Sequence, residues 1–342
     1  MREMPPLARR RSWLINLGLM LGAVGVYLAG QSLVRQFVHQ KPQSLPSPTD
    51  APYRLQFSGD PELTDVLVPG FGVANEAGYA GPAYPVERAP GAFRVLGLGD
   101  SITMGYGSTE AQGYFGQLRH RMEGEFGPGR AEAINLAVTG FGTRQEVRML
   151  EVRGLAYKPD LIILGYCLND WIDVPITVRE AGGALRFQWV DPDHLDVFGM
   201  MKGALSEQSS DEFFRKSFER PLWKSSEAAL ARLAALGKAR HVPVVVVIFP
   251  MFLDWAHYPF ERFHERLAQT VIADGMDVLD LLPVYRQAGP ATDFAPGAEI
   301  EFIHPTVRGH TVAANALYDH LSAKGLLPRS DGAAPGTTGL ER

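Results

Sequence analysis

The sequence predicts an α/β protein in which a parallel sheet is covered by helices on both faces. Short apolar runs recur between residues 93 and 282, and segments of helical character separate them. The runs are apolar at nearly every position, as is typical of strands that are buried on both faces. Strands that alternate with helices along one chain favour a parallel sheet with helices on its two sides. The predicted strands are residues 93–98, 133–138, 161–167, 242–249 and 276–282, and the predicted helices are residues 114–126, 144–157, 225–240, 260–273 and 306–321.

The first 52 residues differ in character from this alternating part. Residues 1–11 contain four arginines, and residues 12–34 contain no charged side chain. About 20 apolar residues suffice to cross a bilayer as a helix, so residues 12–34 are predicted to be a transmembrane signal anchor. The excess of arginine before it predicts a cytoplasmic N-terminus and export of the rest of the chain to the periplasm or the extracellular space. A cleaved signal peptide is the alternative interpretation. The Pro- and Ser-containing residues 35–52 are predicted to be a linker.

The rest of the chain divides into four further parts. Residues 53–90 are rich in glycine and proline and are predicted to be an irregular extension, while residues 91–325 form the predicted α/β domain. Within that domain, residues 171–223 are polar and too long for a plain connection, so we expect an insertion that borders the site. Residues 326–342 are predicted to be a disordered tail. The aromatic side chains of the insertion either stack on sugar rings or simply pack it down; they are Trp171, Phe187, Trp189 and Phe198.

Composition excludes several classes of function. The formal charge of −5 and the pI near 6.0 argue against a nucleic-acid partner, which usually requires a basic face. Cys167 is the only cysteine, so an intramolecular disulfide is excluded, and its apolar surroundings in the sequence indicate a buried residue rather than a reactive thiol. The sequence contains no cluster of metal ligands and no phosphate-binding loop, so we expect neither a metal nor a cofactor.

Chemically useful residues follow three successive predicted strands. Active sites of parallel sheets lie at the carboxyl ends of the strands. The first strand ends in GDSIT with Ser101, the second in NLAVTGFG with Gly140, and the third in LND with Asn169. Each sign alone has an ordinary structural explanation, namely a strand-to-helix turn, a tight turn and a helix cap.

A histidine follows near the C-terminus, in the segment EFIHPTVRGH. Imidazole is the usual general base for a serine hydroxyl, because its pKa lies near working pH, which favours His304 for this role. Glu301 precedes it by three residues and is suited to orient its ring. His310 falls inside the following helix and is interpreted as a capping or surface residue. Asp100 and Asp170 are interpreted as structural partners of the site loops.

The order and spacing of GDSIT, NLAVTGFGT, LGYCLND and HPTVRGH resemble the SGNH (GDSL-type) hydrolases over residues 93–321. The resemblance implies a three-layer α/β/α sandwich with a five-stranded parallel sheet, similar to flavodoxin. It also implies that Ser101 is the nucleophile and His304 the general base. The oxyanion hole implied by the resemblance consists of the amides of Ser101 and Gly140 and the side chain of Asn169.

One position departs from the family pattern. The family normally has aspartate three residues before the histidine, where this sequence has Glu301. Glutamate fills this role in other hydrolase triads, so we assign the acid to Glu301. Asp293 and Glu299 are alternative acids, and a Ser–His dyad is a further alternative.

The resemblance implies a serine esterase that acts on an acylated small molecule, a glycan or a lipid. The predicted membrane tether favours removal of O-acetyl groups from a cell-surface or secreted glycan. Three alternatives stay open at this point. They are an O-acyltransferase that acylates a polysaccharide, a lipid esterase or lysophospholipase, and an inactive binding protein of a polysaccharide machinery.

Overall fold

The computed structural model describes residues 53–127, 129–171, 176–181, 184–189, 211–295 and 302–328. The predicted cytoplasmic segment, signal anchor and linker (residues 1–11, 12–34 and 35–52) lie outside the described residues. Among the helices that are described, none combines the length and the apolar character needed to span a membrane.

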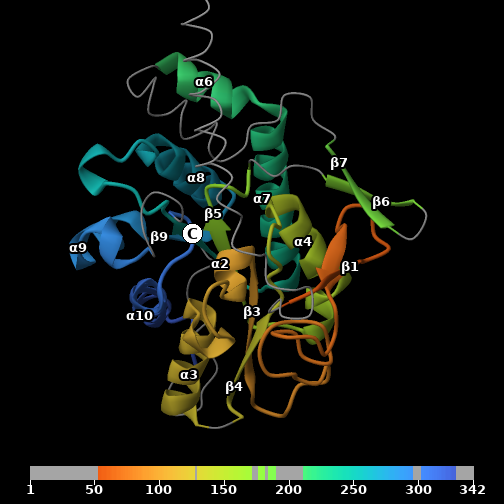
Figure 1. Ribbon diagram of the computed structural model, residues 1–342. Helices are drawn as coiled ribbons and strands as arrows, with labels where there is room; N and C mark the ends of the chain where they lie inside the picture. Colours follow the sequence, from red (N-terminus) through yellow and green to blue (C-terminus); the bar gives the residue numbers. More distant parts are fainter. Residues whose placement is uncertain are drawn as a thin grey trace, which may run out of the picture. The chain divides into compact units, whose positions relative to one another are not determined.

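A five-stranded parallel sheet forms the centre of the described domain, in the order β4-β3-β5-β8-β9 (Figure 1). Its strands are β3 (Phe93–Gly99), β4 (Ala131–Asn135), β5 (Leu161–Cys167), β8 (Val244–Phe249) and β9 (Asp277–Asp280). Their parallel pairing and the helices that join them confirm the predicted α/β class. The first and third strands match the prediction closely, whereas β4 and β9 are shorter than the predicted segments.

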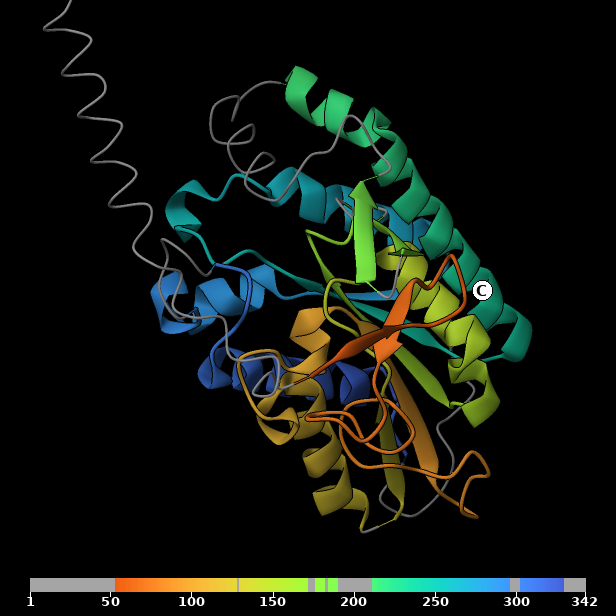
Figure 2. The same ribbon diagram turned by 45° about the vertical axis from the view of Figure 1, so that its right-hand side comes forward.

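The two faces of the sheet carry separate apolar cores. On β3, Leu96 and Leu98 point into one core, while Val95 points into the other, because successive side chains of a strand lie on opposite faces. The core on the Leu96 side receives side chains from α4, α7 and α8, and the opposite core receives them from α3, α9 and α10. Figures 1 and 2 show α4 and α7 on one side of the sheet and α3 and α10 on the other. The bounds are α3 (Tyr114–Phe126), α4 (Thr143–Val152), α7 (Pro221–Arg240), α8 (Glu261–Ala273), α9 (Leu282–Ala288) and α10 (Val307–Ala323).

Several short helical elements were not expected from the sequence pattern. Apart from α9, they are α2 (Ser101–Met104), α6 (Asp211–Glu219), and the 3₁₀ turns η1 (Glu110–Gln112), η2 (Gly154–Tyr157), η3 (Trp255–His257) and η4 (Ala291–Asp293). The predicted helix at residues 144–157 is interrupted, because α4 ends at Val152 and η2 follows. A Cβ on Gly154 would stand 2.7 Å from the Leu96 side chain, so this turn depends on glycine for its close approach to the sheet.

The extension at residues 53–90 is more ordered than predicted. It contains an antiparallel pair, β1 (Leu55–Phe57) and β2 (Asp65–Leu67). Ala80 forms an antiparallel bridge to Asn135 on the edge strand β4. The extension therefore covers one edge of the central sheet, which protects otherwise unpaired backbone groups.

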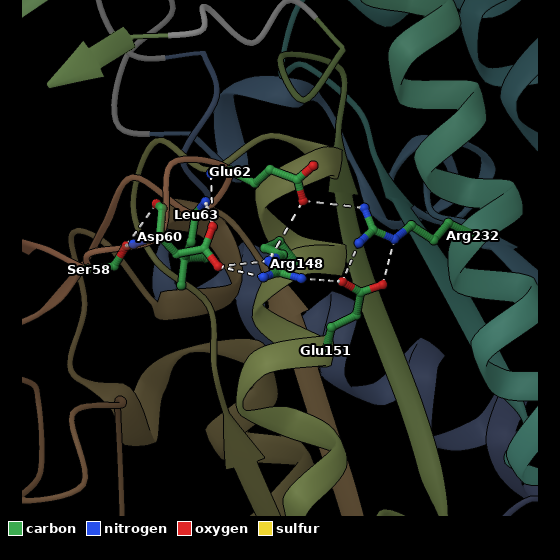
Figure 3. A network of polar contacts seen from close by, with 7 residues as sticks. All are labelled: Ser58, Asp60, Glu62, Leu63, Arg148, Glu151 and Arg232. Atoms are coloured by element: carbon green, nitrogen blue, oxygen red, sulfur yellow. Dashed lines mark hydrogen bonds and ion pairs between the residues drawn. The ribbon is translucent and has the colours of Figure 1, made fainter.

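An ion-pair network joins the extension to two helices (Figure 3). Arg148 of α4 donates hydrogen bonds of 2.9 and 2.7 Å to Asp60 and lies 3.0 Å from Glu151. Arg232 of α7 pairs with Glu151 and, at 3.5 Å, with Glu62. The hydrogen bonds from Arg148 lower the pKa of the Asp60 carboxyl below its ordinary value. Two arginines thus hold the hairpin loop against α4 and α7.

The insertion at residues 171–223 contains a second antiparallel pair, β6 (Ile176–Ala181) and β7 (Ala184–Trp189), and its C-terminal part is helical. Trp171 is only 1% exposed and packs against Trp223 and Phe263, with ring centroids 5.2 and 5.5 Å away. The suggestion that Trp171 stacks on a sugar ring is therefore wrong, since its ring belongs to the core. Phe198 lies outside the described residues.

The first three residues of the predicted tail, residues 326–328, are part of the described domain. Helix α10 is followed by described residues up to 328, and Leu327 is buried in the core beside it. Residues 326–328 therefore belong to the domain, because an apolar side chain in that stretch completes the core. Residues 329–342 lie outside the described part of the chain.

Candidate active site

The ends of β3, β4 and β5 lie side by side, because β3 pairs with both of the others. Helix α2 starts directly at Ser101, one residue after Asp100, which caps it. The Asp100 carboxylate accepts a 2.9 Å hydrogen bond from the Ile102 amide. An abrupt strand-to-helix turn of this kind presents the Ser101 side chain at the carboxyl edge of the sheet, which is where the sequence predicted it.

Two glycines on neighbouring strands make room for this turn. Gly99 and Gly165 are paired in register between β3 and β5. A Cβ on either residue would stand 2.2 Å from Oγ1 of Thr103, the third residue of α2. Gly99 also has a backbone φ of 150°, which residues other than glycine rarely adopt. The absence of both side chains allows α2 to lie directly on the strands.

The structure brings Ser101 and His304 together across the chain. The Ser101 Oγ lies 2.8 Å from the His304 Nε2, although the two residues are 203 positions apart in sequence. Ser101 is 7% exposed, and His304 lies just before α10, whose first turn is capped by the Thr306 hydroxyl. An imidazole nitrogen at this distance can remove the hydroxyl proton.

Asn169 and Asp100 lie next to this pair. The Asn169 Nδ2 donates to the Asp100 Oδ2 at 3.3 Å, and the Ser101 Oγ lies 3.4 Å from the same oxygen. Burial raises the pKa of the Asp100 carboxyl, whereas the Ile102 amide and the charge of His304 act in the opposite direction. Asp170 accepts a 2.8 Å hydrogen bond from the Cys167 amide, so both aspartates hold the loops as the sequence indicated.

Gly140 is an exposed residue in the loop after β4, most of which is buried. Its φ of 76° is left-handed, and a Cβ added there would meet nothing within 4 Å. Glycine is therefore required at this position by the backbone conformation rather than by lack of space. The loop follows the strand beside β3, which agrees with the strand-end position expected for an amide that faces the site.

The predicted acid and one alternative, Glu301 and Glu299, lie outside the described residues. The other alternative, Asp293, pairs with Arg308 at 2.9 Å. The segment that bears His304 is attached to the loop after β8, because the Phe252 amide donates a 2.6 Å hydrogen bond to the Phe302 carbonyl.

The structure contradicts the interpretation of His310 as a surface residue, whereas its side chain does cap a helix, namely α3. His310 is fully buried, and its Nδ1 accepts a 3.3 Å hydrogen bond from the Tyr114 amide at the start of α3. Its ring also stacks on that of Tyr114. Burial, together with the charge of His304, lowers the pKa of His310 to about 4. The sequence placed His310 one to two turns into the last helix, but it did not reveal that this part of the helix faces α3.

Sequence reasoning also missed an aromatic residue beside His304. The Tyr106 ring centroid lies 4.6 Å from that of His304, with 42° between the planes. Tyr106 is 39% exposed and follows Ser101 by five residues. Its proximity to the serine in sequence was a usable signal, but the contact with His304 depends on the fold.

A series of hydrogen bonds between largely buried side chains supports the loop after β8. Asp280 at the end of β9 lies 2.8 Å from the His264 Nδ1, and the His264 Nε2 lies 3.0 Å from the Tyr258 hydroxyl. That hydroxyl accepts a 3.2 Å hydrogen bond from the Met251 amide. The series ends next to Phe252, so it holds the loop to which the His304 segment is attached.

No group of three or more histidine, cysteine or acidic side chains in the described part of the chain is placed to bind a metal ion. Cys167 is buried, and burial raises the pKa of its thiol well above the ordinary value.

Comparison with solved structures finds several similar proteins. An α/β hydrolase enzyme from the metagenome of Lake Arreo, Spain, is 18% identical, with 71% of this chain and 99% of that chain covered and a TM-score of 0.46. The psychrotrophic esterase EstA from a Pseudoalteromonas species is 14% identical, with 68% of this chain and 97% of that chain covered and a TM-score of 0.41. A catalytic mutant of an acetylxylan esterase from Geobacillus stearothermophilus is 15% identical, with 69% of this chain and 95% of that chain covered and a TM-score of 0.42.

Comparison with curated protein sequences gives no significant match. A family model, in contrast, matches residues 98–312, which is more than half of the chain and includes Ser101, Gly140, Asn169 and His304. The matching model is that of the GDSL-like lipase/acylhydrolase family. The chain therefore belongs to the GDSL-like lipase/acylhydrolase family and is a carboxylic ester hydrolase.

Proposed function

We propose that Ser101 attacks the ester carbonyl while His304 removes its proton. The observation that carries this assignment is the 2.8 Å distance between the Ser101 Oγ and the His304 Nε2 at the carboxyl edge of the sheet. The attack forms a tetrahedral intermediate, and His304 then gives the proton to the departing alcohol oxygen. The bond to the alcohol oxygen breaks and leaves the acyl group esterified to the Ser101 Oγ. Water then attacks this ester while His304 removes one of its protons, and the second tetrahedral intermediate collapses as His304 returns that proton to the Ser101 Oγ, which releases the acid.

The negative oxygen of each intermediate is stabilised by three donors: the amides of Ser101 and Gly140 and the side chain of Asn169. Donors that are already in place stabilise the developing charge without reorganisation. Asn169 Nδ2 carries two hydrogens, of which one is directed to Asp100, so the second is available for the substrate.

Replacement of the two central residues tests this assignment. Ser101→Ala and His304→Ala should each lower kcat for p-nitrophenyl acetate by at least about 1,000-fold. Ser322→Ala, at an exposed position of α10, and His120→Ala, at an exposed position of α3, are matched controls and should retain the wild-type rate. Hydrolysis by Ser101→Ala at the wild-type rate would contradict the proposal.

Glu301 is the proposed acid of the triad. Its support is its position three residues before His304 and the engagement of Asp293 with Arg308. Glu301→Gln should lower kcat strongly, because a neutral amide stabilises the imidazolium less than a carboxylate does. Asp293→Asn is the matched comparison. A large loss for Asp293→Asn together with no loss for Glu301→Gln would assign the acid to Asp293.

The proposed substrate is an O-acetylated glycan at the cell surface or in secreted material. This proposal is supported by the uncharged residues 12–34, which we propose to be a membrane anchor with the hydrolase domain exported. Release of acetate from an acetylated oligosaccharide, compared with hydrolysis of long-chain p-nitrophenyl esters, tests the substrate class. Preference for the long-chain esters would favour a lipid substrate and contradict the glycan.

The topology has its own test. A reporter enzyme that is active only outside the cytoplasm, fused after residue 342, should be active in cells that express the full chain. The fusion should remain in the membrane fraction if the anchor is not cleaved. Activity of a cytoplasmic reporter at the same fusion point would overturn the proposed orientation.

A further inference from the structure

The proposed mechanism determines where the alcohol part of an ester must lie. The departing alcohol oxygen takes its proton from the His304 Nε2, so the alcohol lies on the imidazole side of the carbonyl carbon. The negative oxygen points the other way, toward Asn169 and the two amides. A side chain that lies beside the His304 ring and remains open to solvent is therefore placed to contact the alcohol rather than the acid.

Tyr106 occupies that position. Its ring centroid is 4.6 Å from that of His304, yet 39% of the residue is exposed. The face of an aromatic ring is electron-rich and favours contact with C–H groups and other apolar surface. An aromatic ring that touches the imidazole and still remains open to solvent is suited to receive part of the substrate.

The backbone holds this ring in place. The Tyr106 amide donates a 2.9 Å hydrogen bond to the Ser101 carbonyl, and Gly105 and Gly107 on either side adopt φ of 90° and 79°. Tyr53 of the extension lies against the ring in an edge-to-face arrangement, with 6.4 Å between centroids. The tyrosine is therefore positioned before a substrate arrives, which reduces the entropy lost on binding.

We propose that Tyr106 forms a subsite for a ring-shaped alcohol, which in the natural substrate is a sugar ring whose C–H face stacks on the tyrosine. The inference rests on the proposed hydrolysis at Ser101 and names the chemistry of the alcohol. An open-chain alcohol such as ethanol is too small to cover the tyrosine ring. The subsite thus discriminates between alcohols and leaves the acyl group to be selected elsewhere.

The test compares two acetate esters that differ only in the alcohol, cyclohexyl acetate and ethyl acetate, with the full-length protein. Tyr106→Leu should lower the ratio of kcat/KM for cyclohexyl acetate to kcat/KM for ethyl acetate by about tenfold, mainly through KM. Tyr106→Phe retains the ring and should keep this ratio within about twofold of wild type. Phe57→Leu is the control, because Phe57 is 49% exposed but lies in β1, and it should keep the wild-type ratio.

Two outcomes would overturn the subsite. If Tyr106→Leu lowers kcat/KM equally for both esters, the tyrosine acts through His304 and does not bind the alcohol. If the ratio stays at the wild-type value, the ring does not contact the alcohol at all. A thermal melt of each variant separates either result from a loss of folding.

An acetylated methyl xyloside tests the sugar itself. Tyr106→Leu should raise KM for this ester by about tenfold, and Tyr106→Phe should restore it. If wild type hydrolyses cyclohexyl acetate but not the xyloside, the assignment of a sugar is overturned. The ring subsite itself is decided separately, by the ratio of kcat/KM for cyclohexyl acetate to kcat/KM for ethyl acetate. If Ser101→Ala hydrolyses all of these esters as wild type does, the proposed function fails instead.

Discussion

Asp100 organises the proposed reaction centre at the level of single residues. Its carboxylate accepts from the Ile102 amide and lies within 3.4 Å of both the Ser101 Oγ and the Asn169 Nδ2. The buried Asp100 side chain thus connects the end of β3 to the end of β5 through hydrogen bonds. Asn169 is consequently held with one amide hydrogen engaged and one available.

Asn169→Ala tests the amide as an oxyanion donor. Loss of one such donor typically lowers kcat by about 100- to 1,000-fold, and KM should change little because the bond strengthens in the transition state. Asn315→Ala on the exposed side of α10 is the matched control and should retain wild-type kinetics. Steady-state kinetics with p-nitrophenyl acetate measure both values. An unchanged kcat for Asn169→Ala would remove this residue from the proposed oxyanion hole.

His310 gives the stability of the fold a dependence on pH. Its folded pKa of about 4 lies below the value of about 6.5 expected in the unfolded chain. Between these values the unfolded chain binds a proton that the folded chain excludes, so the free energy of unfolding falls as pH falls. A shift of this size corresponds to about 3 kcal/mol.

His310→Asn should reduce this dependence, because an amide oxygen can accept from the Tyr114 amide and does not titrate in this range. The loss of unfolding free energy between pH 7 and pH 4.5, measured with urea, should be smaller in the variant by about 2 kcal/mol. His120→Gln, at an exposed site, should behave as wild type. Equal losses in wild type and His310→Asn would show that His310 does not titrate in this way.

At the scale of elements, the packing of α2 on β3 and β5 determines where Ser101 lies. A Cβ on Gly165 would stand 2.2 Å from the Thr103 Oγ1 and 2.5 Å from the Tyr114 hydroxyl. Gly165→Ala should therefore displace α2, lower kcat at least about tenfold and lower the free energy of unfolding by about 1–3 kcal/mol. Gly124→Ala in α3 meets nothing within 4 Å and should leave kcat unchanged, with a gain in stability of up to about 1 kcal/mol.

Arg94 connects the extension to the start of β3. It is fully buried, pairs with Glu132 at 2.6 Å, and donates to the carbonyls of Pro85, Val86 and Tyr157. Arg94→Met should lower the free energy of unfolding by about 3–5 kcal/mol, because it leaves a buried carboxylate without its charge partner. Arg215→Met, which removes an exposed pair with Glu219, should cost less than about 0.5 kcal/mol. Similar losses in the two variants, measured in urea, would contradict this difference.

At the scale of the molecule, both apolar cores and the described site are built from residues after Pro52. The described domain lies in a compact unit that begins at Pro52. A chain that lacks residues 1–51 should therefore fold and hydrolyse p-nitrophenyl acetate with a kcat/KM within about twofold of that of the full chain in detergent. Loss of activity in a folded truncated chain would show that the N-terminal unit contributes to the site.

The sequence pattern was most informative where an element is buried on both sides. β3 and β5 were predicted within one residue, since their side chains are apolar at almost every position. The extension and α9 were not predicted as ordered elements, because their residues alternate irregularly and are stabilised by contacts with other elements. The stretch after Asn135 was assigned to a strand because it is equally apolar, although β4 has already ended there.

The sequence by itself determined the α/β class, the family resemblance and the positions of Ser101 and His304, because these depend on local pattern and on short motifs. Only the tertiary structure decided that Tyr106 lies against His304, that His310 is buried between helices and that Trp171 belongs to the core. Each of these depends on contacts between segments that are distant in sequence, which hydrophobic periodicity along one element does not encode. The degree of burial and the contacting side chains, rather than the residue type, distinguish the roles of Tyr106, His310 and Trp171.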